Sequence, residues 1–214
     1  MRKMVLALAS AATLAALSAP ASAAVSITYT PGSNALGDNQ VVVEDFGTTA
    51  SAVGINSNIY TSSIVNHGTR PTGSTGGFLA VGSTTSGFGY YTYELATAAP
   101  VLSFLLGTLD TYNSVVLTFV NGDVLSLTGL AITGGQGTVG SAFVDGRVTY
   151  DVQSSNPLDF IQSITFGSTQ SALEIDDIAT AAPEPGTWLM MILGFGLAGA
   201  ALRSRRRQGK LALS

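Results

Sequence analysis

Short runs of apolar residues alternate with polar breaks through most of the chain. Between residues 24 and 182, β-branched and aromatic runs are separated by Gly, Asn, Asp and Ser, and helical periodicity is nearly absent. This pattern indicates an all-β domain, because many short strands at close spacing are best accommodated in two packed sheets. It predicts eleven strands, at residues 25–30, 40–46, 59–65, 77–82, 88–95, 99–106, 114–120, 123–128, 142–151, 160–167 and 172–179. We therefore expect a two-sheet β-sandwich, jelly-roll-like; an immunoglobulin-like sandwich, which normally uses fewer strands, is the alternative.

The clearest local pattern is a hairpin. Val115, Leu117 and Phe119 alternate with residues of the opposite face, and the chain returns over residues 124–127. Between them, Asn121-Gly122 predicts a tight two-residue turn with positive φ.

The last predicted strand breaks its own alternation. Leu173, Ile175 and Asp177 would share one face, yet an aspartate is no core residue. The sequence therefore predicts either a bulge at this point or a partner toward which Asp177 is turned.

The N-terminus has the three parts of an export signal. Arg2 and Lys3 precede an apolar run over residues 5–17, and Ala21-Ser22-Ala23 fits the small-x-small cleavage pattern. We predict a signal peptide over residues 1–23, cut after Ala23 and read by the Sec export machinery.

The C-terminus combines a proline-rich segment, an apolar run and a basic end. Pro183-Glu184-Pro185 precedes the uncharged stretch from Trp188 to Leu202, and the basic end contains Arg203, Arg205, Arg206 and Arg207. As a helix, 15 residues would span about 22 Å, less than a hydrocarbon core of about 30 Å, although flanking residues extend it. The pattern predicts a marginal transmembrane helix over residues 187–202, with the arginines on the cytoplasmic side. A permanent single-pass anchor is the alternative.

Together, Pro183-Glu184-Pro185, the run from Trp188 to Leu197 and the arginine cluster resemble the PEP-CTERM sorting signal of Gram-negative bacteria. The resemblance implies that a membrane-embedded exosortase recognises the tail and cuts near Pro-Glu-Pro. The protein would be anchored transiently in the inner membrane and then released or transferred to the cell surface or its polysaccharide matrix. The expected organisation is a signal peptide at 1–23, a β-sandwich ectodomain at 24–182 and a sorting signal at 183–214.

Two blocks of the body are also similar to one group of exosortase-dependent surface proteins. They are residues 104–113, followed by the valine-rich hairpin, and residues 172–179. The resemblance implies a jelly-roll-like ectodomain and says little about mechanism. The group often has an aromatic residue where Leu106 stands here.

The charge of the exported part differs from that of the whole chain. Seven of the nine basic residues and one of the thirteen acidic residues lie outside residues 24–182, which leaves Arg70 and Arg147 against twelve acids and a net charge of −10. Nucleic-acid binding is therefore not expected, because it requires a basic surface. The chain has no cysteine, so disulfides cannot stabilise the domain.

Few residues offer catalytic chemistry. His67 is the only histidine, and no Gly-x-Ser-x-Gly motif is present, so a nucleophilic triad has no support. Glu174 and Asp176 share one face of a predicted strand, but nothing in the sequence marks either as an acid catalyst. We expect no enzyme activity, no catalytic residues and no required cofactor.

Two ligand hypotheses remain. Asp45, Asp176 and Asp177 could supply hard oxygen ligands to a structural calcium ion, or they could be solvated or cap turns. Tyr91 and Tyr93 share one face of their strand and are candidates for a sugar-stacking surface; if they are core residues, Phe88 and Tyr90 form the other face.

The sequence as a whole predicts an exported, non-enzymatic surface or matrix protein with a structural or adhesive role. A lectin-like module that binds exopolysaccharide is the main alternative, and a secreted hydrolase is a weaker one.

Overall fold

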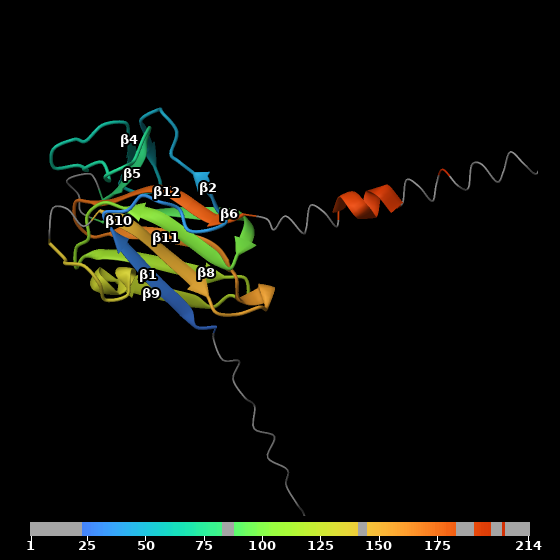
Figure 1. Ribbon diagram of the computed structural model, residues 1–214. Helices are drawn as coiled ribbons and strands as arrows, with labels where there is room; N and C mark the ends of the chain where they lie inside the picture. Colours follow the sequence, from blue (N-terminus) through green and yellow to red (C-terminus); the bar gives the residue numbers. More distant parts are fainter. Residues whose placement is uncertain (1–22, 83–87, 141–144, 183–190, 198–202, 204–214) are drawn as a thin grey trace, which may run out of the picture.

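The computed structural model describes residues 23–82, 88–140, 145–182, 191–197 and 203, and nearly all of its regular structure is β-strand (Figure 1). The strands are β1 (Val25–Pro31), β2 (Gln40–Glu44), β3 (Ser51–Val53), β4 (Ser57–Tyr60), β5 (Phe78–Val81), β6 (Gly89–Ala99), β7 (Val101–Leu106), β8 (Asn113–Phe119), β9 (Val124–Thr128), β10 (Gly146–Val152), β11 (Ile161–Ser168) and β12 (Leu173–Ala181). Two short 3₁₀ helices, η1 (Gly129–Thr133) and η2 (Pro157–Asp159), lie in connections.

The strands form two sheets. Sheet A has the order β1-β10-β7-β12-β5-β4-β3, with β2 also paired to β12, and sheet B has the order β6-β11-β8-β9. All these pairings are antiparallel. Figure 1 shows the sheets as two stacked layers, so the predicted two-sheet all-β architecture is confirmed.

From β5 onward, consecutive strands lie in different sheets, except for the β8–β9 hairpin within sheet B. From β5 onward, sheet A contributes the order β5-β12-β7-β10 and sheet B contributes β6-β11-β8-β9. This order accords with the eight strands of a jelly roll, to which β1 is added on one side and β2, β3 and β4 on the other.

One hydrophobic core lies between the sheets. In β8 the residues Val115, Leu117 and Phe119 are buried while their neighbours are only half-buried, as the alternation in the sequence predicts. The Phe104 ring of β7 in sheet A contacts the Phe166 ring of β11 in sheet B. The two ring centroids are 5.1 Å apart and the rings meet edge-on. In the part of the chain that the structure describes, the buried core residues fall between residues 29 and 179, within the range predicted for the ectodomain.

The hairpin over β8 and β9 is confirmed, but its turn differs from the expected one. Gly122 has a φ of +86°, whereas Asn121 is not among the residues with positive φ. Gly122 donates its N–H to Phe119 O, and Phe119 donates to Asp123 O. These bonds define a turn closed by a glycine bulge, one residue longer than the two-residue turn that was predicted.

Strand prediction failed mainly around residues 51–65. The sequence pattern missed the three-residue strand β3 and placed a strand over 59–65, where the structure has β4 at Ser57–Tyr60 followed by a connection. Both are short strands at the margin of sheet A, where few residues are buried to give a pattern.

Candidate functional site

The outer face of sheet A, which faces away from sheet B, carries the most unusual group of polar residues. Over β7, β10 and β12 this face contains the buried side chains of Ser103, Arg147, Glu174 and Asp176. The β1–β2 connection (residues 32–39) and the β4–β5 connection (residues 61–77) contact these side chains. Polar residues are buried there because two loops cover that part of the sheet; we call this region the covered face.

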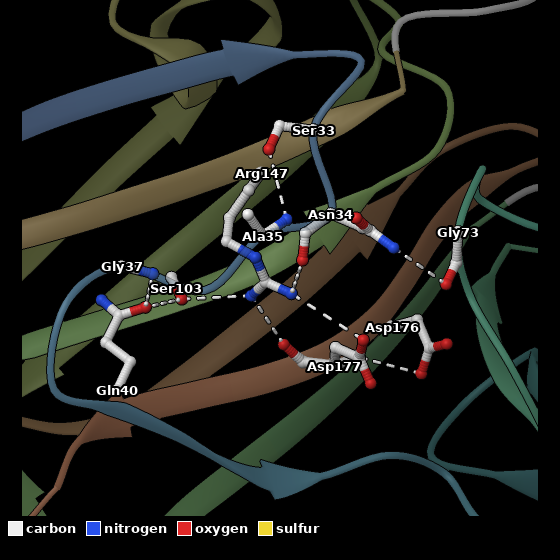
Figure 2. A network of polar contacts seen from close by, with 10 residues as sticks. All are labelled: Ser33, Asn34, Ala35, Gly37, Gln40, Gly73, Ser103, Arg147, Asp176 and Asp177. Atoms are coloured by element: carbon white, nitrogen blue, oxygen red, sulfur yellow. Dashed lines mark hydrogen bonds and ion pairs between the residues drawn. The ribbon is translucent and has the colours of Figure 1, made fainter.

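Arg147 lies at the centre of the covered face, with only 3% of its surface exposed. Its Nη1 donates to Ser103 Oγ at 3.2 Å and to the carbonyl of Asp177 at 3.1 Å (Figure 2). Its Nη2 donates to the carbonyl of Asn34 at 3.3 Å and lies 3.8 Å from Asp177 Oδ2. The side chain therefore joins β7, β10, β12 and the β1–β2 connection.

Burial makes the charge of Arg147 costly. Desolvation lowers the pKa of the guanidinium, and the nearby charges of Asp177 and Asp176 act in the opposite direction. Its Nε has no hydrogen-bond partner among the described residues. Since arginine keeps its proton in proteins, the ion pair with Asp177 is what compensates the buried charge.

Asp177 lies where β12 changes its neighbour. The first part of β12 pairs with β5 through Leu173–Ile175, and the last part pairs with β2 through Ile178–Ala181. Between them the register against β7 shifts, and Asp177 has a φ of +46°. Ile178 rather than Asp177 then enters the core. The sequence offered a bulge or a partner as alternatives at this residue, and the structure has both.

Asp176 is fully buried beside this bulge. Its Oδ1 accepts the N–H of Asp177 at 2.8 Å, while its Oδ2 has no partner among the described residues. Desolvation raises the pKa of Asp176 to about 7, although hydrogen bonds from Ser74 and from the Asp177 N–H favour the charged form. The carboxyl is thus poised between its neutral and charged forms near neutral pH.

Glu174 fastens two connections to β12. Its Oε1 accepts the Thr69 N–H at 3.0 Å, and its Oε2 accepts the Thr108 N–H at 3.2 Å and the Thr108 hydroxyl. Burial raises the pKa of Glu174, and these hydrogen bonds partly oppose the rise. Every one of these partners belongs to the fold itself, which is the pattern of a structural carboxylate.

The three candidate calcium ligands have different surroundings. Asp45 Oδ1 accepts the N–H of Gly47 at 2.9 Å in an exposed turn, whereas Asp176 is buried and Asp177 pairs with Arg147. Desolvation raises the pKa of Asp177, the charge of Arg147 opposes the rise, and the charge of Asp45 adds to it. Among the residues that the structure describes, no group of three or more acidic or histidine side chains could hold a metal ion. Asp45, Asp176 and Asp177 do not form such a group, and Asp177 pairs with Arg147. Calcium binding stays a prediction.

Tyr91 and Tyr93, the predicted sugar-stacking pair, point toward the core side of sheet B. Both are only partly buried and pack against the core cluster. The Tyr91 ring meets Phe46 edge-on, with centroids 5.9 Å apart, and the Tyr93 hydroxyl donates to the carbonyl of Val43 at 3.0 Å. The prediction chose the inner face of β6; the exposed aromatic residues are Phe88 and Tyr90 on the other face.

One surface feature was not found from the sequence. It is an open apolar groove of about 650 Å³ between β2, the end of β6 and the end of β12, lined by residues such as Val41, Leu95 and Ala182. A second feature was found only in part: Phe88 and Tyr90 were the alternative aromatic face, and the structure adds the exposed Ile55 beside them. An alternating pattern reveals which two faces a strand has, but not which face a partner sheet covers.

Comparison with known proteins bears on the end of the chain. Residues 181–207 match the family described as the PEP-CTERM protein-sorting motif. The chain carries a PEP-CTERM sorting motif. A search of curated proteins found no match. The matched residues begin at Ala181, the last residue of β12, so the PEP-CTERM motif starts where the described sandwich ends.

The structure describes only part of the PEP-CTERM tail. Of the predicted signal-cleavage motif, it describes only residue 23. Pro183, Glu184, Pro185, Trp188, Arg205, Arg206 and Arg207 lie outside the described residues, as does Ala21; Arg203 and Ala23 are described. Residues 191–197 are helical and exposed. Within the described residues no helix is long and apolar enough to cross a membrane, so the predicted span over 187–202 is not confirmed.

Proposed function

We propose that this protein is exported and sorted by an exosortase to the cell surface or extracellular matrix, where its jelly-roll ectodomain has a non-enzymatic structural or adhesive role. The observation that carries the proposal is the PEP-CTERM sorting motif over residues 181–207. Such a motif accounts for delivery and leaves the activity to the domain that precedes it.

The boundary between sandwich and tail supports processing near Pro183-Glu184-Pro185. Ala181 is the last residue of β12 to pair with β2, opposite Gln40, and Ala182 donates its N–H to Asn39 O at 2.6 Å. All described pairings of β12 therefore precede Pro183. A cut beyond Ala182 would release a domain that keeps every strand pairing.

The contacts of the acidic residues support a non-enzymatic role. Glu174 accepts three hydrogen bonds from two connections, and Asp177 pairs with Arg147. A carboxylate that acts on a substrate must be reachable by it, whereas Glu174 and Asp176 are covered by loops. Their arrangement favours a role in holding the outer loops on sheet A.

A lectin-like role is the second candidate. It is favoured by the exposed aromatic residues Phe88 and Tyr90, which are 55% and 42% exposed. Exposed aromatic groups of this kind mark interaction surfaces more often than chance positions do.

Intact-mass measurement of the surface protein tests the sorting proposal. We expect mature protein that begins at Ala24 and lacks Trp188 to Ser214, and we expect a variant with alanine at Pro183, Glu184 and Pro185 to retain the tail. Surface protein that keeps residues 188–214 in the wild type would contradict exosortase processing.

A further inference from the structure

The outer face of sheet B carries many hydroxyl side chains and few charges. Alternation and register place twelve side chains on it in three rows across four strands. Seven of the twelve are Ser or Thr, one is Gly, and Glu94 is the one acid or base among them. Ser163 is buried, so six hydroxyl residues remain accessible on this face. The rows are Tyr90–Gly167–Ser114–Thr128, Thr92–Thr165–Val116–Ser126 and Glu94–Ser163–Thr118–Val124.

At one end of this face, three apolar side chains are exposed together: Ile55 (47%), Phe88 (55%) and Tyr90 (42%). The Phe88 and Tyr90 ring centroids are 5.9 Å apart. Ile55 and Tyr90 exchange both backbone hydrogen bonds at 2.9 Å, so their side chains lie on the same face. We call this group the aromatic end.

Close backbone contacts fix the aromatic end in place. Gly54 has a φ of +54°, and a Cβ there would lie 2.4 Å from Tyr90 O, so only glycine allows this approach. Asn56 donates from Nδ2 to Phe88 O at 2.6 Å, and Asn56 O accepts the N–H of Gly82 at 2.9 Å. The exposed side chains are thus held by a rigid backbone before any ligand arrives, which lowers the cost of binding.

Hydroxyls continue from the aromatic end across the sheet. Gly167 is the neighbour of Tyr90 on β11 and has no side chain. The Ser114 hydroxyl takes up the space beside it: Ser114 Oγ lies 2.5 Å from the position that a Cβ of Gly167 would have. In the next row the Thr92 and Thr165 hydroxyls are hydrogen-bonded at 2.8 Å. With strands about 4.8 Å apart, each row spans about 14 Å. A strip of this length suits a short oligosaccharide.

The chemistry of the face selects among ligands. Hydroxyls both donate and accept hydrogen bonds, as sugar hydroxyls do, and exposed rings pack against the C–H face of a sugar. The single charge, Glu94, and the net charge of −10 of residues 24–182 disfavour acidic polymers. We propose that the aromatic end and the hydroxyl rows of sheet B bind a neutral polysaccharide. This inference rests on the adhesive role proposed above and assigns it a site.

Affinity electrophoresis of residues 24–182, which contain the buried core residues that the structure describes, tests the site with dextran and laminarin as neutral polysaccharides and alginate as an acidic one. We expect retardation by at least one neutral polymer, unchanged by 0.5 M salt, and none by alginate. Phe88→Ser and Tyr90→Ser should each weaken binding about tenfold, or about 1.4 kcal/mol, because each removes a ring contact and its buried area. Val65→Ser, which removes an apolar side chain that is 85% exposed outside this face, is the matched control and should bind like wild type.

Two results would overturn the site. One is no retardation by either neutral polymer; the other is retardation that the Phe88→Ser and Tyr90→Ser variants keep in full. Circular dichroism of the variants verifies that they are folded. Neither result touches the sorting proposal, which depends on loss of the tail and not on sugar binding.

Discussion

Arg147 donates a hydrogen bond to the carbonyl of Asp177, 30 residues later in the chain, and its guanidinium also lies 3.8 Å from the carboxylate of the same residue. One side chain thus contacts both the backbone and the charge of the residue at which β12 leaves β5 for β2. The bulge and the ion pair stabilise each other, because the carbonyl is presented to Arg147 only by the turned backbone of Asp177.

Replacement of Arg147 should be among the most destabilising changes in the domain. Arg147→Met removes the cation that pairs with Asp177. Because the Asp177 side chain is 26% exposed, the free energy of unfolding should fall by about 2–3 kcal/mol, less than the loss of a fully buried pair would cost. Urea denaturation of residues 24–182 measures the loss. Arg70→Met is the control: Arg70 lies over the Phe78 ring, 5.4 Å from its centroid, and is less buried, so its loss should be smaller. Equal effects of the two variants would contradict a special role of Arg147.

Stability should decrease as the pH rises from about 4 to about 7. Asp176 has a folded-state pKa of about 7 against an ordinary value of 3.8, so between these values the folded state holds a proton that the unfolded state has lost. Its contribution is present in full below the unfolded pKa and is lost as pH passes the folded pKa. A difference of about 3 between the two pKa values corresponds to at most about 4 kcal/mol. Raised pKa values of Glu174 and Asp177 act in the same direction.

Urea denaturation at pH 5 and pH 8 checks this pH dependence. Asp176→Asn should remove much of the difference between the two values, because an amide does not titrate. Asp38→Asn, which removes an exposed acid, is the matched control. If the wild type and the Asp176→Asn variant lose the same free energy of unfolding between pH 5 and pH 8, the pH dependence does not come from Asp176.

The calcium hypothesis has a direct thermal test. If Asp45, Asp176 and Asp177 shared an ion, a hundredfold excess over Kd would add about 2.7 kcal/mol, or roughly 5–10 °C in Tm. Because Arg147 already pairs with Asp177, we expect the Tm of residues 24–182 to be the same in EDTA and in millimolar calcium. A fall in EDTA that Asp177→Asn abolishes would instead support the calcium site.

The basic end of the tail should be needed for sorting. Replacing Arg203, Arg205, Arg206 and Arg207 with glutamine removes the positive charges that would hold this end in the cytoplasm in the proposed topology, so tail retention and processing should fail. Cell fractionation with intact-mass analysis of the surface pool measures the outcome. Unchanged delivery of the quadruple variant would show that the cluster is dispensable, and Lys210→Gln serves as a control with one charge removed.

The sequence predicts the sandwich well because its two sheets share one core. In β8 the alternation of Val115, Leu117 and Phe119 is enough to define the inner face, and the irregular position of Asp177 correctly signals the bulge. The covered face is different. Arg147 and Glu174 look like exposed strand residues until two loops, distant in sequence, are folded over them, and no local pattern encodes that contact.

The choice between the two aromatic faces of β6 could not be made from the sequence for a related reason. Tyr91 and Tyr93 differ from Phe88 and Tyr90 only in parity, and both pairs are equally aromatic. Which pair is exposed depends on where sheet A lies. The same limit applies to the candidate calcium ligands Asp45, Asp176 and Asp177. The spacing of the acidic residues does not reveal that Arg147, 30 residues before Asp177, lies beside it.

The position of β12 also governs the order of events during export. A chain that is translocated from its N-terminus delivers β12 last, yet β12 is the interior strand to which β7, β5 and β2 are hydrogen-bonded. In the proposed route, sheet A can close only after residue 181 has been translocated, and the sorting motif follows directly behind it. A protease that acts before this point would meet an open sheet, whereas an exosortase that cuts beyond Ala182 would meet a closed one.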